Sequence, residues 1–158
     1  MQKGFTLIEI LLVMAIISIL FAISIVNLNT LQQNTYQNTS EELLLSDIKL
    51  QQLKSMTGDN NNSSTFETFG IYFGNTSYTL FRGATYSASD DENFTIELNP
   101  NLTFSNVEFA NSQIVFEKNS GEIIGFTDGS DTITINNSIT GTNAVITLNK
   151  YGVITDIQ

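Results

Sequence analysis

One carboxylate stands alone in a long apolar run near the start of the chain. Glu9 is the only charged residue between Phe5 and Val26. In a membrane helix an acidic residue costs up to about 2.5–3.5 kcal/mol, so such a residue is expected to have a partner. A cut between Gly4 and Phe5 would give Phe5 an α-ammonium group with a pKa of about 7.7–8.0. We therefore predict that Glu9 pairs with this amine, in its own chain or in a neighbour displaced along a bundle of identical helices.

The run that contains Glu9 is long enough to cross a membrane. At about 1.5 Å per residue, a helix from Phe5 to Val26 spans a bilayer core of about 30 Å. Lys3 is the only charge before Glu9, and the next charges after it are Glu41 and Glu42. The positive-inside rule then places the N-terminus in the cytoplasm and the rest of the chain outside the cytoplasmic (inner) membrane, as a single-pass protein.

The run Lys3-Gly4-Phe5-Thr6-Leu7-Ile8-Glu9, followed by an uninterrupted apolar helix, resembles the class III signal of type IV prepilins and of the pseudopilins of type II secretion. The resemblance implies that residues 1–4 are a leader peptide, that a prepilin peptidase cuts after Gly4 and methylates Phe5, and that Glu9 is the carboxylate used in subunit assembly. Two alternatives remain. A conventional signal peptide is disfavoured by the length of the run and by the absence of a small-x-small cleavage site. A plain membrane anchor would let Glu9 snorkel near the helix end.

The amino-acid composition excludes most kinds of catalytic chemistry. The chain has no His, Cys or Trp, so imidazole acid–base catalysis, thiol nucleophiles and disulfides are excluded. Scattered Ser and Asp residues have no His with which to form a hydrolytic triad, and no Gly-rich phosphate loop follows a strand. A net charge of −10 repels nucleic-acid phosphate and anionic lipid. We therefore expect a protein that is not an enzyme, has no cofactor and does not bind nucleic acid.

Two acidic turns are weak candidates for a calcium site. The segment Asp90-Asp91-Glu92 and the pair Asp128 and Asp131 could offer carboxylate oxygens, which hard cations prefer. Neither segment has the spacing of an EF-hand. Solvated turn residues are the favoured interpretation of both, and we expect no bound metal.

Residues 27–57 continue the helix with an amphipathic pattern. Apolar residues recur at spacings near three, four and seven to eight, as on one side of a helix; they are Leu28, Leu31, Tyr36, Leu44, Leu45, Ile48, Leu53 and Met56. Gly58 and the Asp and Asn residues after it end the pattern. The sequence thus predicts one helix from Phe5 to about Met56, with a transmembrane segment at residues 5–26 and an amphipathic segment at residues 27–57.

Beyond Gly58 the pattern becomes strand-like, with β-branched and aromatic residues alternating with polar ones between Gly, Asn and Asp. The predicted strands are Thr68–Phe73, Ser77–Arg82, Asn93–Leu98, Asn101–Phe104, Gln113–Glu117, Ile123–Phe126, Thr132–Ile135, Ala144–Leu148 and Val153–Ile157. Gly74-Asn75 and Asn119-Ser120-Gly121 are predicted as turns. The fold class is therefore α+β, a long N-terminal helix packed on an antiparallel β-sheet head at residues 58–158, as in pilins.

The C-terminal third carries a second resemblance. Its strand–Gly–strand rhythm is similar to the end of the H-type minor pseudopilins and their fimbrial relatives, with Phe116, Gly121 and Gly152 in the corresponding places. An Arg often follows the last Gly in that family, whereas this chain has Val153.

Together the resemblances imply a structural subunit of a type II secretion pseudopilus or a type IV pilus, with a minor, H-type role in protein secretion. Its partners would be the prepilin peptidase, other pilin or pseudopilin subunits and the inner-membrane assembly platform. The alternative is a major pilin, or a minor pilin whose head binds a ligand or DNA in adhesion or DNA uptake.

Overall fold

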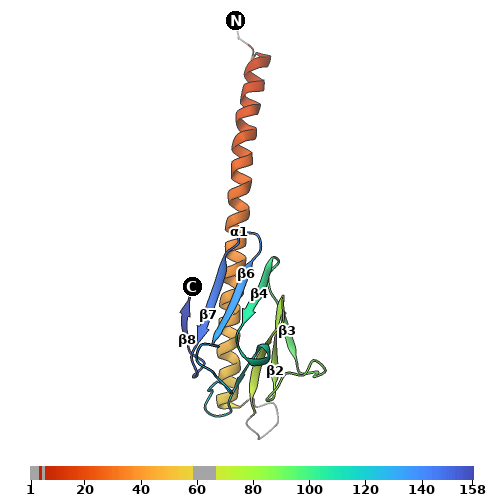
Figure 1. Cartoon of the computed structure of the whole chain (residues 1–158). Coiled ribbons are helices and arrows are strands. Elements are labelled where there is room, and N and C mark those ends of the chain that lie inside the picture. Colours follow the sequence, from red (N-terminus) through yellow and green to blue (C-terminus); the bar gives the residue numbers. More distant parts are fainter. Residues whose placement is uncertain (1–3, 5, 59–66) are drawn as a thin grey trace.

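A long helix runs the length of the molecule and carries a β-rich head on its second half (Figure 1). The computed structural model describes residue 4, residues 6–58 and residues 67–158, without the side chains of residues 23–30. Helix α1 extends from Leu7 to Thr57 as one element. Its first half projects alone from the head, and the N-terminus lies at the far end of this projection (Figure 1).

Both ends of α1 have caps that the local sequence explains. Thr6 is the N-cap, with an extended backbone and a side chain that accepts the Glu9 N–H. At the other end Gly58 adopts a φ of 77°, which glycine tolerates best, and its N–H donates to the Lys54 carbonyl at 2.9 Å. The helix predicted from Phe5 to about Met56 is therefore observed from Leu7 to Thr57.

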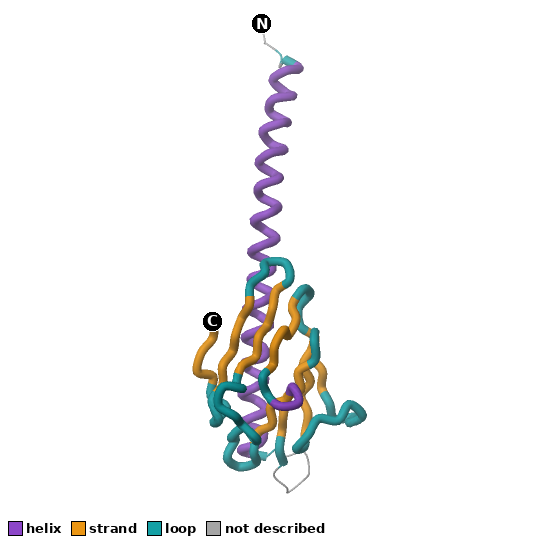
Figure 2. Tube along the Cα trace, in the orientation of Figure 1, coloured by secondary structure: helices purple, strands orange, loops and turns teal. Residues whose placement is uncertain are grey.

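Two antiparallel four-stranded sheets form the head (Figure 2). The first sheet has the order β3-β2-β1-β5 and consists of β1 (Phe69–Phe73), β2 (Ser77–Arg82), β3 (Phe94–Glu97) and β5 (Gln113–Phe116). The second has the order β4-β6-β7-β8 and consists of β4 (Leu102–Val107), β6 (Thr132–Asn137), β7 (Asn143–Leu148) and β8 (Ile154–Ile157). A short 3-10 turn, η1 (Ala110–Ser112), precedes β5. The predicted α+β architecture is confirmed.

The predicted strand at Ile123–Phe126 is wrong. Ile123 makes only an isolated bridge to Phe116, and the chain then turns away. Gly121 and Gly125, on either side, both have a φ of 69°. A positive φ is incompatible with an extended strand, so the two glycines limit the pairing to one residue.

The two sheets and α1 share one hydrophobic core. Strand alternation supplies it: in β6, Ile133 and Ile135 point inward and are fully buried, while Thr132 and Thr134 are partly exposed. From the helix, Leu44 and Ile48 enter the same core and are also fully buried. One face of the second half of α1 is therefore part of the core of the head, which fixes the helix from about its midpoint onward.

The apolar stripe predicted on the second half of α1 is correct only at its centre. Leu44 and Ile48 are buried, but Leu31, Leu53 and Met56 are 63%, 55% and 43% exposed. Leu28 has a side chain outside the described residues. The buried face is continued instead by polar side chains, at Gln37, Ser40, Gln51 and Ser55. Their burial has a physical reason, since each has a hydrogen-bond partner in the head: Gln51 and Ser55 bond backbone groups of the first sheet, and Gln37 and Ser40 bond Thr142 and Asn99 in the loops.

Candidate functional site

The first turn of α1 holds the predicted assembly carboxylate. Glu9 lies in this turn, and Gly4 lies just outside it and is exposed. Phe5, the predicted methylated terminus, lies outside the described residues. The structure thus places Gly4 and Glu9 at the same free end of the helix, far from the head (Figure 1).

A capping box holds the Glu9 side chain in place. Oε2 of Glu9 accepts hydrogen bonds from the Thr6 backbone N–H at 2.9 Å and from the Thr6 hydroxyl at 2.8 Å. In return, the Glu9 N–H donates to Thr6 Oγ1 at 3.4 Å. Oε1 makes no hydrogen bond within the described residues, so Thr6 holds one carboxylate oxygen and leaves the other available. Sequence reasoning missed Thr6, although the T-x-x-E spacing before an apolar run is the signature of this motif.

The side chains that follow Glu9 form an exposed apolar surface. The large apolar residues from Leu7 to Phe21 are between 43% exposed, at Ile17, and 79% exposed, at Leu7. Contiguous apolar surface of this kind marks a protein or membrane contact. Over the part of α1 whose side chains the structure describes, no stretch is both long enough and apolar enough to span a bilayer.

Two adjacent glutamines attach the other end of α1 to the head. Gln51 Nε2 donates to the carbonyls of Gly70, at 2.8 Å, and Phe81, at 3.4 Å, both in the first sheet. Gln52 Nε2 donates to the carbonyls of Gly121, at 2.9 Å, and Tyr151, at 2.6 Å, in the turns that follow β5 and β7. One turn of helix therefore holds both halves of the head.

Gly121 and Gly152 give Gln52 the space it needs. A Cβ at Gly152 would lie 2.6 Å from Gln52 Nε2 and 2.8 Å from Phe116 Cε1. A Cβ at Gly121 would lie 2.7 Å from Met56 Cγ. These are the two glycines of the C-terminal strand–Gly–strand pattern, and the structure assigns their role to the close approach of α1.

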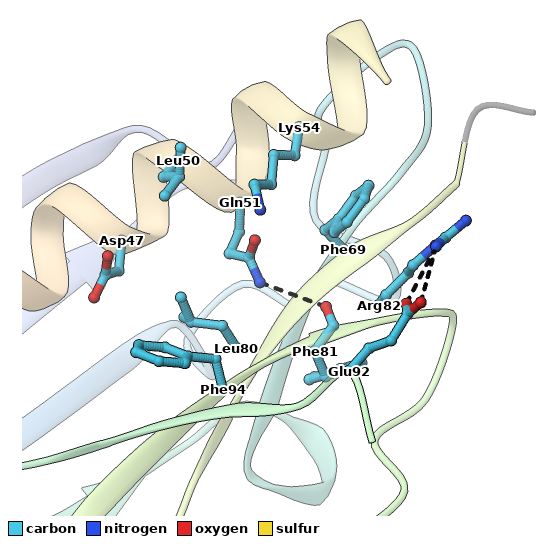
Figure 3. A pocket seen from close by; sticks show the side chains of 10 residues that line it. All are labelled: Asp47, Leu50, Gln51, Lys54, Phe69, Leu80, Phe81, Arg82, Glu92 and Phe94. Atoms are coloured by element: carbon cyan, nitrogen blue, oxygen red, sulfur yellow. Dashed lines mark hydrogen bonds and ion pairs between the residues drawn. The ribbon is translucent and has the colours of Figure 1, made fainter. Parts of the chain in front are cut away.

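A groove of about 530 Å³ separates α1 from the β2–β3 edge of the first sheet (Figure 3). Leu50, Leu80 and Phe94 line its apolar part. At one end, Arg82 forms ion pairs with Glu67 and with Glu92, the latter at 3.1 Å. The hydrogen bond that Arg82 donates to Glu67 raises the pKa of Arg82, and the guanidinium stays charged. Opposed charges thus close this end of the groove.

Asp47, which lines the groove, bonds a buried phenol of the core. Tyr78 is fully buried, and its hydroxyl donates to Asp47 Oδ2 at 2.6 Å. Burial, and then the hydrogen bond to Asp47, raise the pKa of Tyr78 well above its usual range. The phenol is therefore a neutral donor at physiological pH, and the contact joins α1 to β2. The groove offers packing and ion pairs rather than a nucleophile paired with a base.

The acidic turns do not converge on a common point. Asp90 Oδ1 accepts the Glu92 backbone N–H at 2.9 Å, which is a local turn contact, and the Glu92 side chain is paired with Arg82. The described residues contain no group of three acidic side chains that could hold a metal ion. The candidates Asp91, Asp128 and Asp131 are thus not brought together with the others.

One comparison with known proteins bears on the end of the helix just described. Residues 1–25 match the model of the prokaryotic N-terminal methylation motif. The N-terminus therefore carries a class III signal of the type IV prepilin kind. The matched segment includes Gly4, Thr6 and Glu9. No curated protein and no solved structure matches the chain significantly.

Proposed function

We propose that the chain is a pilin-like structural subunit, processed by a prepilin peptidase and assembled through its N-terminal helix into a filament. The observation that carries the proposal is the methylation motif at residues 1–25, which lies on a helix whose free half exposes apolar side chains. The β-rich head on the other half of the same helix agrees with this role.

Cleavage between Gly4 and Phe5 creates the cation that assembly requires. Before cleavage the Glu9 carboxylate is held by Thr6 through Oε2 alone. After cleavage the other oxygen, Oε1, is available to the methylated Phe5 amine of a neighbour. Pairing of the two charges in apolar surroundings removes the cost of burying each one singly. The leader thereby prevents assembly until it is removed.

Between synthesis and assembly the subunit is stored in the cytoplasmic membrane. Residues 5–26 cross it, the N-terminus faces the cytoplasm, and the head lies outside. The apolar side chains of the projecting half support this placement, as does the absence of any charge between Glu9 and Glu41. The assembly platform then transfers the helix from lipid into the filament, where neighbouring helices replace lipid.

Within this class we favour a minor, H-type pseudopilin of type II secretion. Support comes from Gly121 and Gly152 of the strand–Gly–strand pattern. Glycine is needed at these two positions because the Gln52 side chain approaches them closely. The role is structural and not enzymatic. A second candidate is a pilin whose head binds a ligand, favoured by the groove between α1 and the β2–β3 edge.

Intact-mass and N-terminal peptide analysis of the full chain in its native membrane tests the proposal. We expect a mature chain that begins at methylated Phe5. Gly4→Val should block cleavage, because the peptidase would meet a branched side chain at the cut. Glu9→Gln should be cleaved normally yet fail to enter filaments. An unprocessed wild-type chain that begins at Met1 would contradict the proposal and leave a plain membrane anchor.

A further inference from the structure

Two tyrosine rings lie in direct contact on the first sheet. Tyr72 is in β1, and Tyr86 is in the loop of residues 83–93 that joins β2 to β3 (Figure 1). Their ring centres are 4.1 Å apart and their planes are 5° from parallel. Ile71 and Phe73 belong to the core shared with α1, so strand alternation directs Tyr72 to the opposite face of the sheet. No other two tyrosine rings touch within the described part of the chain.

Two further contacts hold Tyr86 over this face. Its ring meets the Phe81 ring edge-on, with the centres 5.7 Å apart and an angle of 63° between the planes. Its backbone N–H donates to Gln113 Oε1 at 3.1 Å, and Gln113 lies directly opposite Tyr72 in the β1–β5 pair. The two phenol rings are thus held together in the folded chain, and a reaction between them needs no large movement of the loop.

Both phenols are open to reagents in solvent. Tyr72 and Tyr86 are each half-buried, and neither hydroxyl has a hydrogen-bond partner among the residues that the structure describes. Tyr72 also borders a depression of about 360 Å³ beside the Gly74-Asn75 turn. Tyr78 differs from both, because it is fully buried and its hydroxyl is bonded to Asp47.

We propose that Tyr72 and Tyr86 are a site of oxidative cross-linking, at which a peroxide acting through a peroxidase joins the two rings. Each phenol gives up one hydrogen atom, as one electron and one proton, and becomes a phenoxyl radical. The two radicals form a carbon–carbon bond between ring positions ortho to the hydroxyls, and the hydrogens at these positions then move to the oxygens. The peroxide accepts the two hydrogen atoms and leaves as two molecules of water.

The stacked geometry favours this bond over a bond between chains. At 4.1 Å between ring centres, carbons of the two rings are in van der Waals contact. The unpaired electron of a phenoxyl radical resides on its oxygen and on its ortho and para ring carbons, so reactive positions lie close together. Groups held in this way react as if at a concentration far above that of a dilute protein solution. Coupling within one chain is therefore expected to dominate.

The cross-link would give this head the kind of covalent constraint that disulfides give to others. The chain has no Cys, so a disulfide cannot fix the loop of residues 83–93. A bond between Tyr72 and Tyr86 would attach that loop to β1, and thiols would not reverse it as they reverse a disulfide. The inference concerns the head alone and does not depend on cleavage after Gly4.

Tryptic peptide mapping locates the cross-link, because Arg82 lies between the two tyrosines. We treat the full chain in detergent with hydrogen peroxide and a haem peroxidase. We expect residues 55–82 joined to residues 83–118, at the summed mass less two hydrogen atoms. The joined peptide should show the fluorescence of dityrosine, and its yield should not change when the chain is diluted. Oxidation of Met56 adds an oxygen atom instead and is distinguished by mass.

Phenylalanine variants supply matched controls. Tyr72→Phe and Tyr86→Phe keep an aromatic ring at each position but remove one phenol, and each should lower the yield of joined peptide by at least about tenfold. Tyr151→Phe should leave the yield unchanged, because Tyr151 is 56% exposed and touches no other tyrosine ring within the described residues. A small photochemical oxidant, a ruthenium tris-bipyridyl complex with persulfate under light, repeats the experiment without the bulk of an enzyme.

The outcomes are distinct. Absence of the joined peptide with both oxidants, while Tyr151 is oxidised in the same samples, would overturn the inference. A joined peptide that persists in Tyr72→Phe would also overturn it, since residues 55–82 contain Tyr78 as well. A joined peptide that is lost in both Tyr72→Phe and Tyr86→Phe and kept in Tyr151→Phe would establish the site.

Discussion

Thr6 and Glu9 form a pair in which each side chain serves the other's backbone. The hydroxyl of Thr6 accepts the Glu9 N–H and thereby caps the helix. The backbone N–H and the hydroxyl of Thr6 both donate to one carboxylate oxygen of Glu9. A carboxylate held in this way approaches a neighbour's amine in one orientation, without first losing side-chain freedom. Thr6 is thus a positioning residue for the proposed assembly contact, and its hydroxyl is the group to change.

Removing that hydroxyl should separate processing from assembly. Thr6→Ala is expected to weaken the N-terminal cap by about 1 kcal/mol and to reduce polymer while cleavage after Gly4 continues. Thr6→Ser keeps the hydroxyl and is the matched control. Quantitative immunoblots of cleaved chain and of sedimentable polymer measure both steps. Equal polymer from Thr6→Ala and Thr6→Ser would show that the capping box has no part in assembly.

The pH dependence of unfolding tests how much Tyr78 contributes to the stability of the head. Its pKa is raised in the folded state, so its hydroxyl contributes fully below the pKa of an unfolded tyrosine, about 10. Above that pH the unfolded chain ionises first, and the contribution is lost as the pH rises toward the folded value. Tyr78→Phe should therefore unfold about 1–2 kcal/mol more easily at pH 7 and lose part of its alkaline sensitivity.

Thermal unfolding of the detergent-solubilised chain between pH 7 and pH 11 measures this difference. Tyr151→Phe is the control, because Tyr151 is 56% exposed and no contact of its hydroxyl joins the helix to the sheets. If wild type and Tyr78→Phe fell in parallel above pH 10, the contact with Asp47 would not contribute as described.

At the scale of elements, the head depends on how closely α1 approaches its turns. Gln51 and Gln52 reach carbonyl groups in both halves of the head, and glycines line the path of Gln52. The Gln51 contacts satisfy buried backbone carbonyls, and an unpaired carbonyl there would be costly. The second half of α1 is thus part of the folded head and also supports it.

Gly152→Ala should lower the free energy of unfolding more than an alanine substitution at another glycine of similar backbone conformation. Gly152 has a φ of 67°, and the new Cβ would also meet Gln52 and Phe116. Gly129 has a φ of 82° and nothing within 4 Å of its Cβ position. Gly129→Ala should cost about 1–2 kcal/mol from backbone strain alone, and Gly152→Ala at least about 1 kcal/mol more. Equal shifts in denaturation midpoint would contradict the close approach.

Strand positions followed from the sequence because alternation and turn residues are local signals. β1 and β2, for example, are runs rich in aromatic and β-branched residues on either side of Gly74-Asn75. The buried face of α1 could not be predicted in the same way. Its Gln and Ser residues bond groups of distant strands and loops, and residues buried in this way leave no apolar periodicity in the sequence. The prediction of a strand at Ile123–Phe126 failed because Gly125 has a φ of 69°, and the sequence does not reveal which conformation a glycine adopts.

The N-terminal site was the easiest part of the chain to predict. A lone carboxylate in an apolar run is rare because burying its charge in a membrane helix costs free energy. Glu9 was predicted on that basis and Gly4 from the resemblance to the class III signal, whereas Thr6 required attention to the spacing of a cap. The groove beside α1 was not foreseeable, because Leu50, Leu80 and Phe94 come together only when the sheet is placed on the helix.

At the scale of the whole molecule, the helix divides into a free half and an embedded half. The first hydrogen bond between α1 and the head, among the described residues, joins Asn137 Nδ2 to the Gln33 carbonyl at 3.4 Å. Contacts at Tyr36, Ser40 and Gln37 follow it. The projecting half thus contributes nothing visible to the stability of the head.

A fragment of residues 31–158 should therefore fold as a soluble monomer. Its thermal midpoint is expected to stay within a few degrees of that of the full chain in detergent, since no described hydrogen bond of the head is removed. Circular dichroism and sedimentation measure fold and mass. A molten or aggregated fragment would show that the projecting half stabilises the head as well as anchoring it.

Within the part of the chain that the structure describes, most hydrogen bonds between helix and head are uncharged. Amide and hydroxyl groups of Gln51, Gln52, Ser55 and Asn99 make them, while the ionised side chains Asp47 and Lys54 contact Tyr78 and the Phe69 ring. Salt screens charges and acid titrates carboxylates, but neither acts directly on an amide. A fibre built from such subunits would keep its heads attached in brine or mild acid, while the ionic contacts between subunits weakened around them.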